Sequence, residues 1–233
     1  MDSLTDRQEK LLELVVRRHV ETAEPIGSGW LAEQMGVSSA TARNEMSALE
    51  SEGYLVQPHT SAGRVPTERG YRYFVSRFLA PKAASEDAAA SLREAASPED
   101  AAERMKRVAK SLAEHALSTS LVGFGPRDVY YTGLTNLFSK PEFAEAAHVT
   151  SMSKVLDHLD EVMERVFRDV EEDIEIRVGK YCPFGTTCAV LMTRVPYGDS
   201  VGIIALLGPM RMDYDAAYGL LKEAVKILNE NHE

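Results

Sequence analysis

The strongest constraint on the fold lies near the start of the chain, where three helices are predicted with very short connections. Thr5 to Gln8 form a capping box, and apolar residues then recur at three- and four-residue spacing up to the break at Pro25. Ser28 is expected to cap a second helix that stops at Gly36. Ser38 is expected to cap a third that stops at Gly53. The three-residue turn Gly-Val-Ser between the last two helices predicts a helix-turn-helix.

The third predicted helix has one apolar and one polar face. Ala42, Met46 and Leu49 fall on one side and are expected to be buried. The other side and the first turn carry small, polar and basic residues: Ser39, Ala40, Thr41, Arg43, Asn44 and Ser47. Arginine pairs with guanine and asparagine with adenine, while hydroxyls and helix N-terminal amides bind phosphate. The face favours DNA recognition, although a small helical bundle with a solvated face is the alternative.

A loop rich in glycine and proline follows, with the sequence QPHTSAGRVP. A short strand at YLVQ precedes it and a helix capped by Thr67 comes after it, so we expect a wing. Arg64 is expected at the wing tip, in the minor groove, and Gly63 is expected to hold a backbone conformation that a side chain would resist. His59, Thr60 and Ser61 are expected on phosphate. A surface hairpin with a solvated arginine is the alternative.

The charge is unevenly distributed along the chain. The formal net charge is -10. Residues 57–82 carry five basic residues against Glu68, whereas residues 81–233 carry 17 Lys and Arg against 25 Asp and Glu. We therefore expect an acidic C-terminal part joined to an N-terminal part that carries a basic patch.

The remainder predicts an α+β domain behind a linker. Residues 80–97 are rich in alanine and charge, so we expect a linker that packs on nothing. Helices are expected from the Ser97–Asp100 start to about Leu117, over about 153–170, and after Asp213. At least three strands are expected, around residues 174–178, 186–195 and 200–207.

Catalytic and metal sites are not indicated. Cys182 and Cys188 supply half of a zinc site and predict free buried thiols, and no cofactor motif occurs. No long apolar run predicts a membrane helix, and no signal-peptide core is present. We expect a non-enzymatic, reduced, cytoplasmic protein associated with the nucleoid.

The segments SSATARNEM, LESEGYL and QPHTSAGRVPTERGYR resemble the N-terminal domain of the heat-inducible transcription repressor family HrcA. YYTGLTNLFSKPEF, IRVGKY and GPMRMDY occur downstream in the family's order. The resemblance implies a winged-helix repressor that binds, as a homodimer, double-stranded DNA at an inverted repeat upstream of chaperone genes. It also implies a GAF-like C-terminal domain and dependence on a GroEL-type chaperonin.

The chain departs from the family in length. LSTSLVGFGP passes almost directly into RDVYYTGLTNLF, where the family places part of the GAF-like domain and an inserted dimerisation domain. We expect a winged helix-turn-helix DNA-binding domain over residues 1–79, a linker over residues 80–97, and a reduced GAF-like regulatory and dimerisation domain over residues 98–233. The residues expected to contact DNA are Ser28, Ser38, Ser39, Thr41, Arg43, Asn44, Ser47, His59, Thr60, Ser61, Gly63, Arg64 and Arg72.

Two other functions compete with this interpretation. The GAF-like domain could bind a small molecule and control the repressor, which requires an enclosed pocket. The chain could also be an enzyme or metal protein with an accessory DNA-binding head, which requires clustered polar side chains that the sequence does not show.

Overall fold

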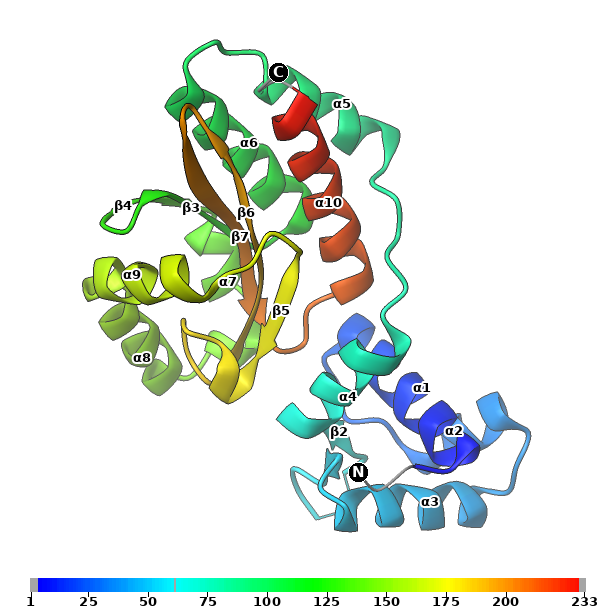
Figure 1. The fold of residues 1–233 in the computed structure, drawn as a ribbon. Helices are drawn as coiled ribbons and strands as arrows, with labels where there is room; N and C mark the ends of the chain where they lie inside the picture. Colours follow the sequence, from blue (N-terminus) through cyan, green and yellow to red (C-terminus); the bar gives the residue numbers. More distant parts are fainter. Residues whose placement is uncertain (1–3, 61, 231–233) are drawn as a thin grey trace. The chain divides into compact units, whose positions relative to one another are not determined.

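The computed structural model describes residues 4–60 and 62–230 (Figure 1). The contacts divide the chain into two compact units: the first ends at Leu79 and the second begins at Ala80. Each unit has its own core and is described separately.

The first unit packs four helices against a two-stranded hairpin. Its elements are α1 (Asp6–Thr22), α2 (Ser28–Met35), α3 (Ser39–Ser51), β1 (Leu55–Val56), β2 (Val65–Pro66) and α4 (Glu68–Phe78). The buried faces of α1 and α3 supply much of the core, including Leu11, Leu12, Met46 and Leu49. β1 and β2 pair antiparallel and form the wing stem. This is the predicted winged helix-turn-helix.

The helix ends of this unit largely follow the sequence signals. The Thr5 side chain accepts from the Gln8 amide and Gln8 reaches back, which confirms the capping box. Ser38 caps α3 through the Thr41 amide, as predicted. Ser28 is instead the first residue of α2, and Gly27 occupies the N-cap without a side-chain bond. The predicted role of Ser28 as a cap is therefore wrong, since its hydroxyl turns toward α3.

The second unit is built on a five-stranded antiparallel sheet of order β4-β3-β7-β6-β5. Its elements are α5 (Glu86–Ala95), α6 (Ala101–Ala116), β3 (Thr119–Gly125), β4 (Asp128–Thr132), α7 (Leu134–Phe138), a 3₁₀ turn (Pro141–Phe143), α8 (Ala146–Asp157), α9 (Leu159–Asp169), β5 (Glu175–Val178), a second 3₁₀ turn (Gly179–Tyr181), β6 (Cys188–Tyr197), β7 (Ser200–Pro209) and α10 (Tyr214–Glu230). The predicted α+β class is confirmed.

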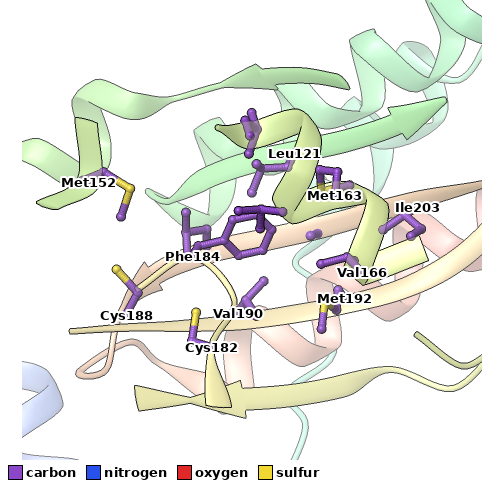
Figure 2. Packing of buried hydrophobic residues seen from close by; sticks show 14 of the residues in the cluster. Leu121, Met152, Met163, Val166, Cys182, Phe184, Cys188, Val190, Met192 and Ile203 are labelled. Carbon is purple, nitrogen blue, oxygen red and sulfur yellow. The ribbon is translucent and has the colours of Figure 1, made fainter. Parts of the chain in front are cut away.

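Helices cover both faces of this sheet. α6 and α10 pack on one side, while α7, α8 and α9 lie on the other (Figure 1). Met163 and Val166 of α9 point into the cluster formed with Leu121, Met192 and Ile203 of the strands (Figure 2). The central strands are buried on both faces, so their sequences read as continuous apolar runs.

The segment 80–97 is not the linker that its composition predicts. Within it α5 packs against α6 and α10, Leu92 is fully buried, and the Ser91 and Ser111 hydroxyls lie 2.8 Å apart. Ala88 and Ala89 are also buried. Because alanine allows helices to approach closely, a helix with few large apolar residues can still bury one face.

The residues before α5 are also held in place, against the start of α10. The Ala80 amide donates to the Asp215 carboxylate at 2.8 Å, and the Lys82 amide donates to the Asp215 carbonyl at 3.0 Å. A side chain at Gly219 would place its Cβ 1.6 Å from the Lys82 carbonyl oxygen. The expected linker is therefore an ordered part of the second unit.

Three further expectations in this unit need correction. The helix expected from Ser97 begins at Ala101 instead, because Asp100 caps it. The helix expected over 153–170 is two helices that meet at His158. Strands β3 and β4 were not predicted. They form a hairpin with only two residues between the paired Gly125 and Asp128, which is the place where the family's additional segments are expected to be missing.

Candidate nucleic-acid interface

The outward face of α3 carries two unengaged polar side chains. Arg43 and Asn44 are exposed, and neither side chain makes a hydrogen bond or ion pair within the part of the chain that the structure describes. The apolar side of the same helix is buried through Ala42, Met46 and Leu49. Both side chains are therefore free to meet an external partner, and their donor and acceptor groups suit the edges of guanine and adenine.

Four hydroxyl residues gather at the first turn of α3. The Ser38 hydroxyl accepts from the Thr41 amide at 3.1 Å and lies 2.9 Å from the Thr41 hydroxyl. The Ser39 and Ser28 hydroxyls lie 3.2 Å apart, which joins the starts of α2 and α3. The structure thus brings together four of the predicted contact residues beside the free amides of a helix N-terminus, where phosphate is favoured.

The wing projects from a very short ladder. β1 and β2 share two residue pairs, Leu55 with Pro66 and Val56 with Val65. His59 and Thr60 are exposed in the turn beyond. Ser61, predicted to contact phosphate, lies outside the described residues. Of the predicted phosphate contacts in the wing, His59 and Thr60 are the ones that the structure places at the tip.

Arg64 is not at the wing tip, and this prediction is wrong. Its side chain is 13% exposed, and its guanidinium bonds the Glu50 carboxylate at 2.8 Å and the Ser47 hydroxyl at 3.0 Å. Its amide and carbonyl pair with those of Ile26 at 3.0 and 2.9 Å. Arg64 comes five positions after His59, so the turn lies farther out and the arginine folds back onto α3.

Ser47 and Gly63 have structural tasks that the sequence did not reveal. The Ser47 hydroxyl donates to the Arg43 carbonyl at 2.9 Å and accepts from Arg64. Gly63 is not among the glycines with positive φ. A Cβ there would instead lie 2.3 Å from the Ile26 carbonyl oxygen. The predicted sensitivity of Gly63 therefore has a different cause, which is the close approach of two backbones.

The five cations of the basic patch expected at residues 57–82 each have an intramolecular partner, while Arg77 and Lys82 stay 63% and 59% exposed. Arg72, one of the predicted DNA contacts, is half-buried on α4 and lies 3.3 Å from Glu68. The partners of the five cations are Glu50 for Arg64, the Glu52 carbonyl for Arg69, Glu68 for Arg72, Glu9 for Arg77 and Asp213 for Lys82. Local charge in the sequence therefore overstates the cationic surface.

Two of the sequence motifs of the second unit contact each other directly, and one of them also bonds to neighbouring backbone. Glu142 of the KPEF segment and Arg211 of the GPMRMDY segment form an ion pair at 2.5 Å, although they are 69 positions apart in the sequence. The side-chain amide nitrogen of Asn136 donates to the Ala113 and Ser118 carbonyls at 3.0 and 3.2 Å. These contacts help to hold the second unit together.

The two cysteines are buried in the cluster of Figure 2, beside Phe184 and Val190. Burial raises the pKa of both thiols, to about 11 for Cys188. Among residues 4–60 and 62–230, no group of three or more His, Cys, Asp or Glu is arranged to hold a metal ion.

A groove of about 630 Å³ lies at the end of the β6–β7 hairpin. Glu172, Asp173 and Asp199 line it, together with Arg194. The Arg194 guanidinium donates to the Val170 carbonyl at 2.7 Å, so it is held within the protein. Acidic residues thus outnumber basic residues among the charged residues that line the groove.

No helix within the described residues is both long and apolar enough to cross a bilayer. The first unit, a winged helix-turn-helix with an exposed arginine and asparagine on α3, and the α+β second unit together define a two-unit protein whose N-terminal unit has a fold of the DNA-binding type. Comparisons with known proteins identify the family.

The family model for the HrcA protein C terminal domain matches residues 73–217. The heat-inducible transcription repressor HrcA of Bifidobacterium animalis subsp. lactis is 46% identical over 112 residues, covering 46% of this chain and 31% of the relative. That of Rhodococcus jostii is 57% identical over 79 residues, covering 33% and 23%. The chain thus covers less than a third of either relative's length. It belongs to the HrcA family.

Two comparisons extend along nearly the whole chain. The HrcA repressor of Carboxydothermus hydrogenoformans is 24% identical and covers 97% of this chain and 98% of the relative. That alignment has 334 positions against 233 residues here, so the relative carries segments with no counterpart in this chain. A crystal structure described only as a hypothetical protein has a TM-score of 0.80 at 20% identity and covers 99% of each chain. Its fold is the same.

Proposed function

We propose that this protein is a DNA-binding transcription repressor of heat-shock genes, acting on an inverted-repeat operator upstream of chaperone genes. The observation that carries the proposal is the pair Arg43 and Asn44, exposed and unengaged on α3 beside the wing. Relatives named heat-inducible transcription repressors support the assignment of target genes.

In this mechanism α3 enters the major groove and the two side chains read base edges. The hydroxyl cluster at the start of α3 and the wing residues His59 and Thr60 bind phosphate and set the register. The head carries no net positive charge, because residues 1–80 hold nine Lys and Arg against eleven Asp and Glu, and several of its cations pair with these acids. Specificity therefore depends on a few contacts more than on a large positive field.

The repressor acts as a homodimer, because one winged helix reads only a few base pairs and a twofold repeat requires two heads. The second unit supplies the dimer contact and reports the load on protein folding, in dependence on a GroEL-type chaperonin. The protein acts in the cytoplasm, on the nucleoid, and catalyses no reaction.

Footprinting on the region upstream of the chaperonin operon in the source genome tests the proposal. We expect protection of an inverted repeat, and sedimentation of the protected duplex with two copies of the protein. Protection that is absent, or equal on scrambled DNA, would contradict the repressor function. A single bound copy on one half-site would contradict the dimer.

A further inference from the structure

One carboxylate on α3 contacts the residues that flank both strands of the wing. The Oε1 atom of Glu50 accepts from the amide of Gln57, directly after β1, at 3.2 Å. Its Oε2 atom accepts from Nε of Arg64, directly before β2, at 2.8 Å, and the terminal nitrogen of that arginine lies 2.8 Å away as well. Arg64 also donates to Ser47, one helical turn before Glu50. We call Glu50, Arg64, Ser47 and Gln57 the wing anchor.

The wing needs such support because its ladder is short. The ladder has two residue pairs, and an isolated two-stranded hairpin is at best marginally stable in water. Beyond them, the Gln57 side chain donates to the Ala62 carbonyl at 2.9 Å, and the Ala62 amide donates to the His59 carbonyl at 3.0 Å. These bonds shape the loop but do not attach it to α3. Attachment to the recognition helix comes through Glu50, which contacts both sides of the loop, and through the Ser47 hydroxyl, which contacts one side of it, at Arg64.

The charge of Glu50 also needs an explanation. An acid near a bound polyanion weakens binding, unless a cation compensates it or it has another task. The Arg64 side chain is 13% exposed and pairs with this carboxylate. A charge-assisted hydrogen bond of this kind is roughly twice as strong as a neutral one. The pair is nearly neutral toward DNA, and it engages Nε and one terminal nitrogen of Arg64 within the protein.

We propose that Glu50 is a positioning residue that fixes the wing on the recognition helix, with Arg64 as its internal counter-cation and not a phosphate ligand. The inference rests on the proposed DNA-binding function. It predicts that removing the negative charge of Glu50 weakens specific binding, whereas simple electrostatics predicts the opposite. The sign of the effect separates the two.

The experiment compares Glu50→Gln with the matched control Glu45→Gln. Glu45 lies on the same helix, and its carboxylate pairs with Arg7 at 3.5 Å, away from the wing. Each variant of the full chain is titrated with the duplex protected in the footprint and with a scrambled duplex, at several salt concentrations. We expect Glu50→Gln to lower affinity for the protected duplex about tenfold, the equivalent of one charged hydrogen bond, and Glu45→Gln to leave it unchanged or slightly higher.

Arg64 variants provide a second measurement. We expect Arg64→Ala to weaken specific binding without changing the salt slope, and Arg64→Lys to recover part of the loss because it keeps the charge with fewer donors. A slope lower by about one would assign Arg64 to a phosphate and overturn the proposal. Glu50→Gln binding as tightly as Glu45→Gln would overturn it too.

Hydrogen exchange without DNA separates this inference from the repressor function. We expect the Gln57 and Arg64 amides to exchange about tenfold faster in Glu50→Gln, while amides of α1 do not change. If the wild-type protein binds no specific duplex, the proposed function fails. The comparison of amide exchange rates then tests by itself whether Glu50 holds the wing on α3. Equal exchange in both proteins would refute it.

Discussion

The close approach of Gly63 to Ile26 gives the sharpest prediction for the head. In Gly63→Ala the new Cβ would lie 2.3 Å from the Ile26 carbonyl oxygen and 2.4 Å from its carbonyl carbon. Contacts under 3.0 Å between a Cβ and a backbone atom require the backbone to move. The methyl group therefore separates the returning strand of the wing from the segment before α2.

The size of the effect follows from what this separation breaks. Two backbone hydrogen bonds join Ile26 and Arg64, at 2.9 and 3.0 Å. Each contributes about 1 kcal/mol net, so we expect the free energy of unfolding of the head to fall by about 2 kcal/mol. If the wing must be attached for DNA binding, the same loss corresponds to an affinity about thirtyfold lower.

Gly29→Ala is the matched control, because it makes the same chemical change in the same unit. Gly29 lies inside α2, and a Cβ there meets no atom within 4 Å. Alanine is favoured over glycine in a helix by about 0.5–1 kcal/mol, so we expect slightly higher stability and unchanged DNA affinity. The assays are urea denaturation followed by circular dichroism and titration with the protected duplex. Equal urea midpoints and equal duplex affinities for Gly63→Ala and Gly29→Ala would refute the argument that Gly63 is needed for the close approach to Ile26.

Three further outcomes are expected. Leu92→Ala should lower the free energy of unfolding of the second unit by about 3 kcal/mol, and Leu117→Ala, at a 60% exposed position, by less than about 0.5 kcal/mol; equal urea midpoints would restore the linker interpretation. Arg43→Ala and Asn44→Ala should each cost about 1–3 kcal/mol on the protected duplex and much less on scrambled DNA, whereas equal losses on both would remove them from base readout. Burial raises the pKa of Cys188 from near 9.0 to about 11, so the thiol stays protonated in the folded state while the unfolded chain ionises. Urea midpoints should therefore fall as pH rises from about 9 toward 11, and rapid alkylation of the folded protein at pH 8 would contradict this burial.

Local signals in the sequence determined the head almost completely. Capping by Thr5 and Ser38, the stop at Gly36 and the apolar spacing of α3 act over a few residues, so they are visible without tertiary structure. The same spacing identified Arg43 as outward-facing. The strands at 188–197 and 200–209 were also visible, because buried central strands read as long apolar runs.

Contacts between distant residues were decided only by the fold. Arg64 meets Glu50 fourteen positions away, and Gly63 meets Ile26 across the unit, so the sequence could show that these residues were unusual but not what they touch. The alanine-rich segment was misjudged for the same reason. Whether a small side chain is solvated or lies in a tight helix contact depends on the partner surface, and here α6 and α10 supply it.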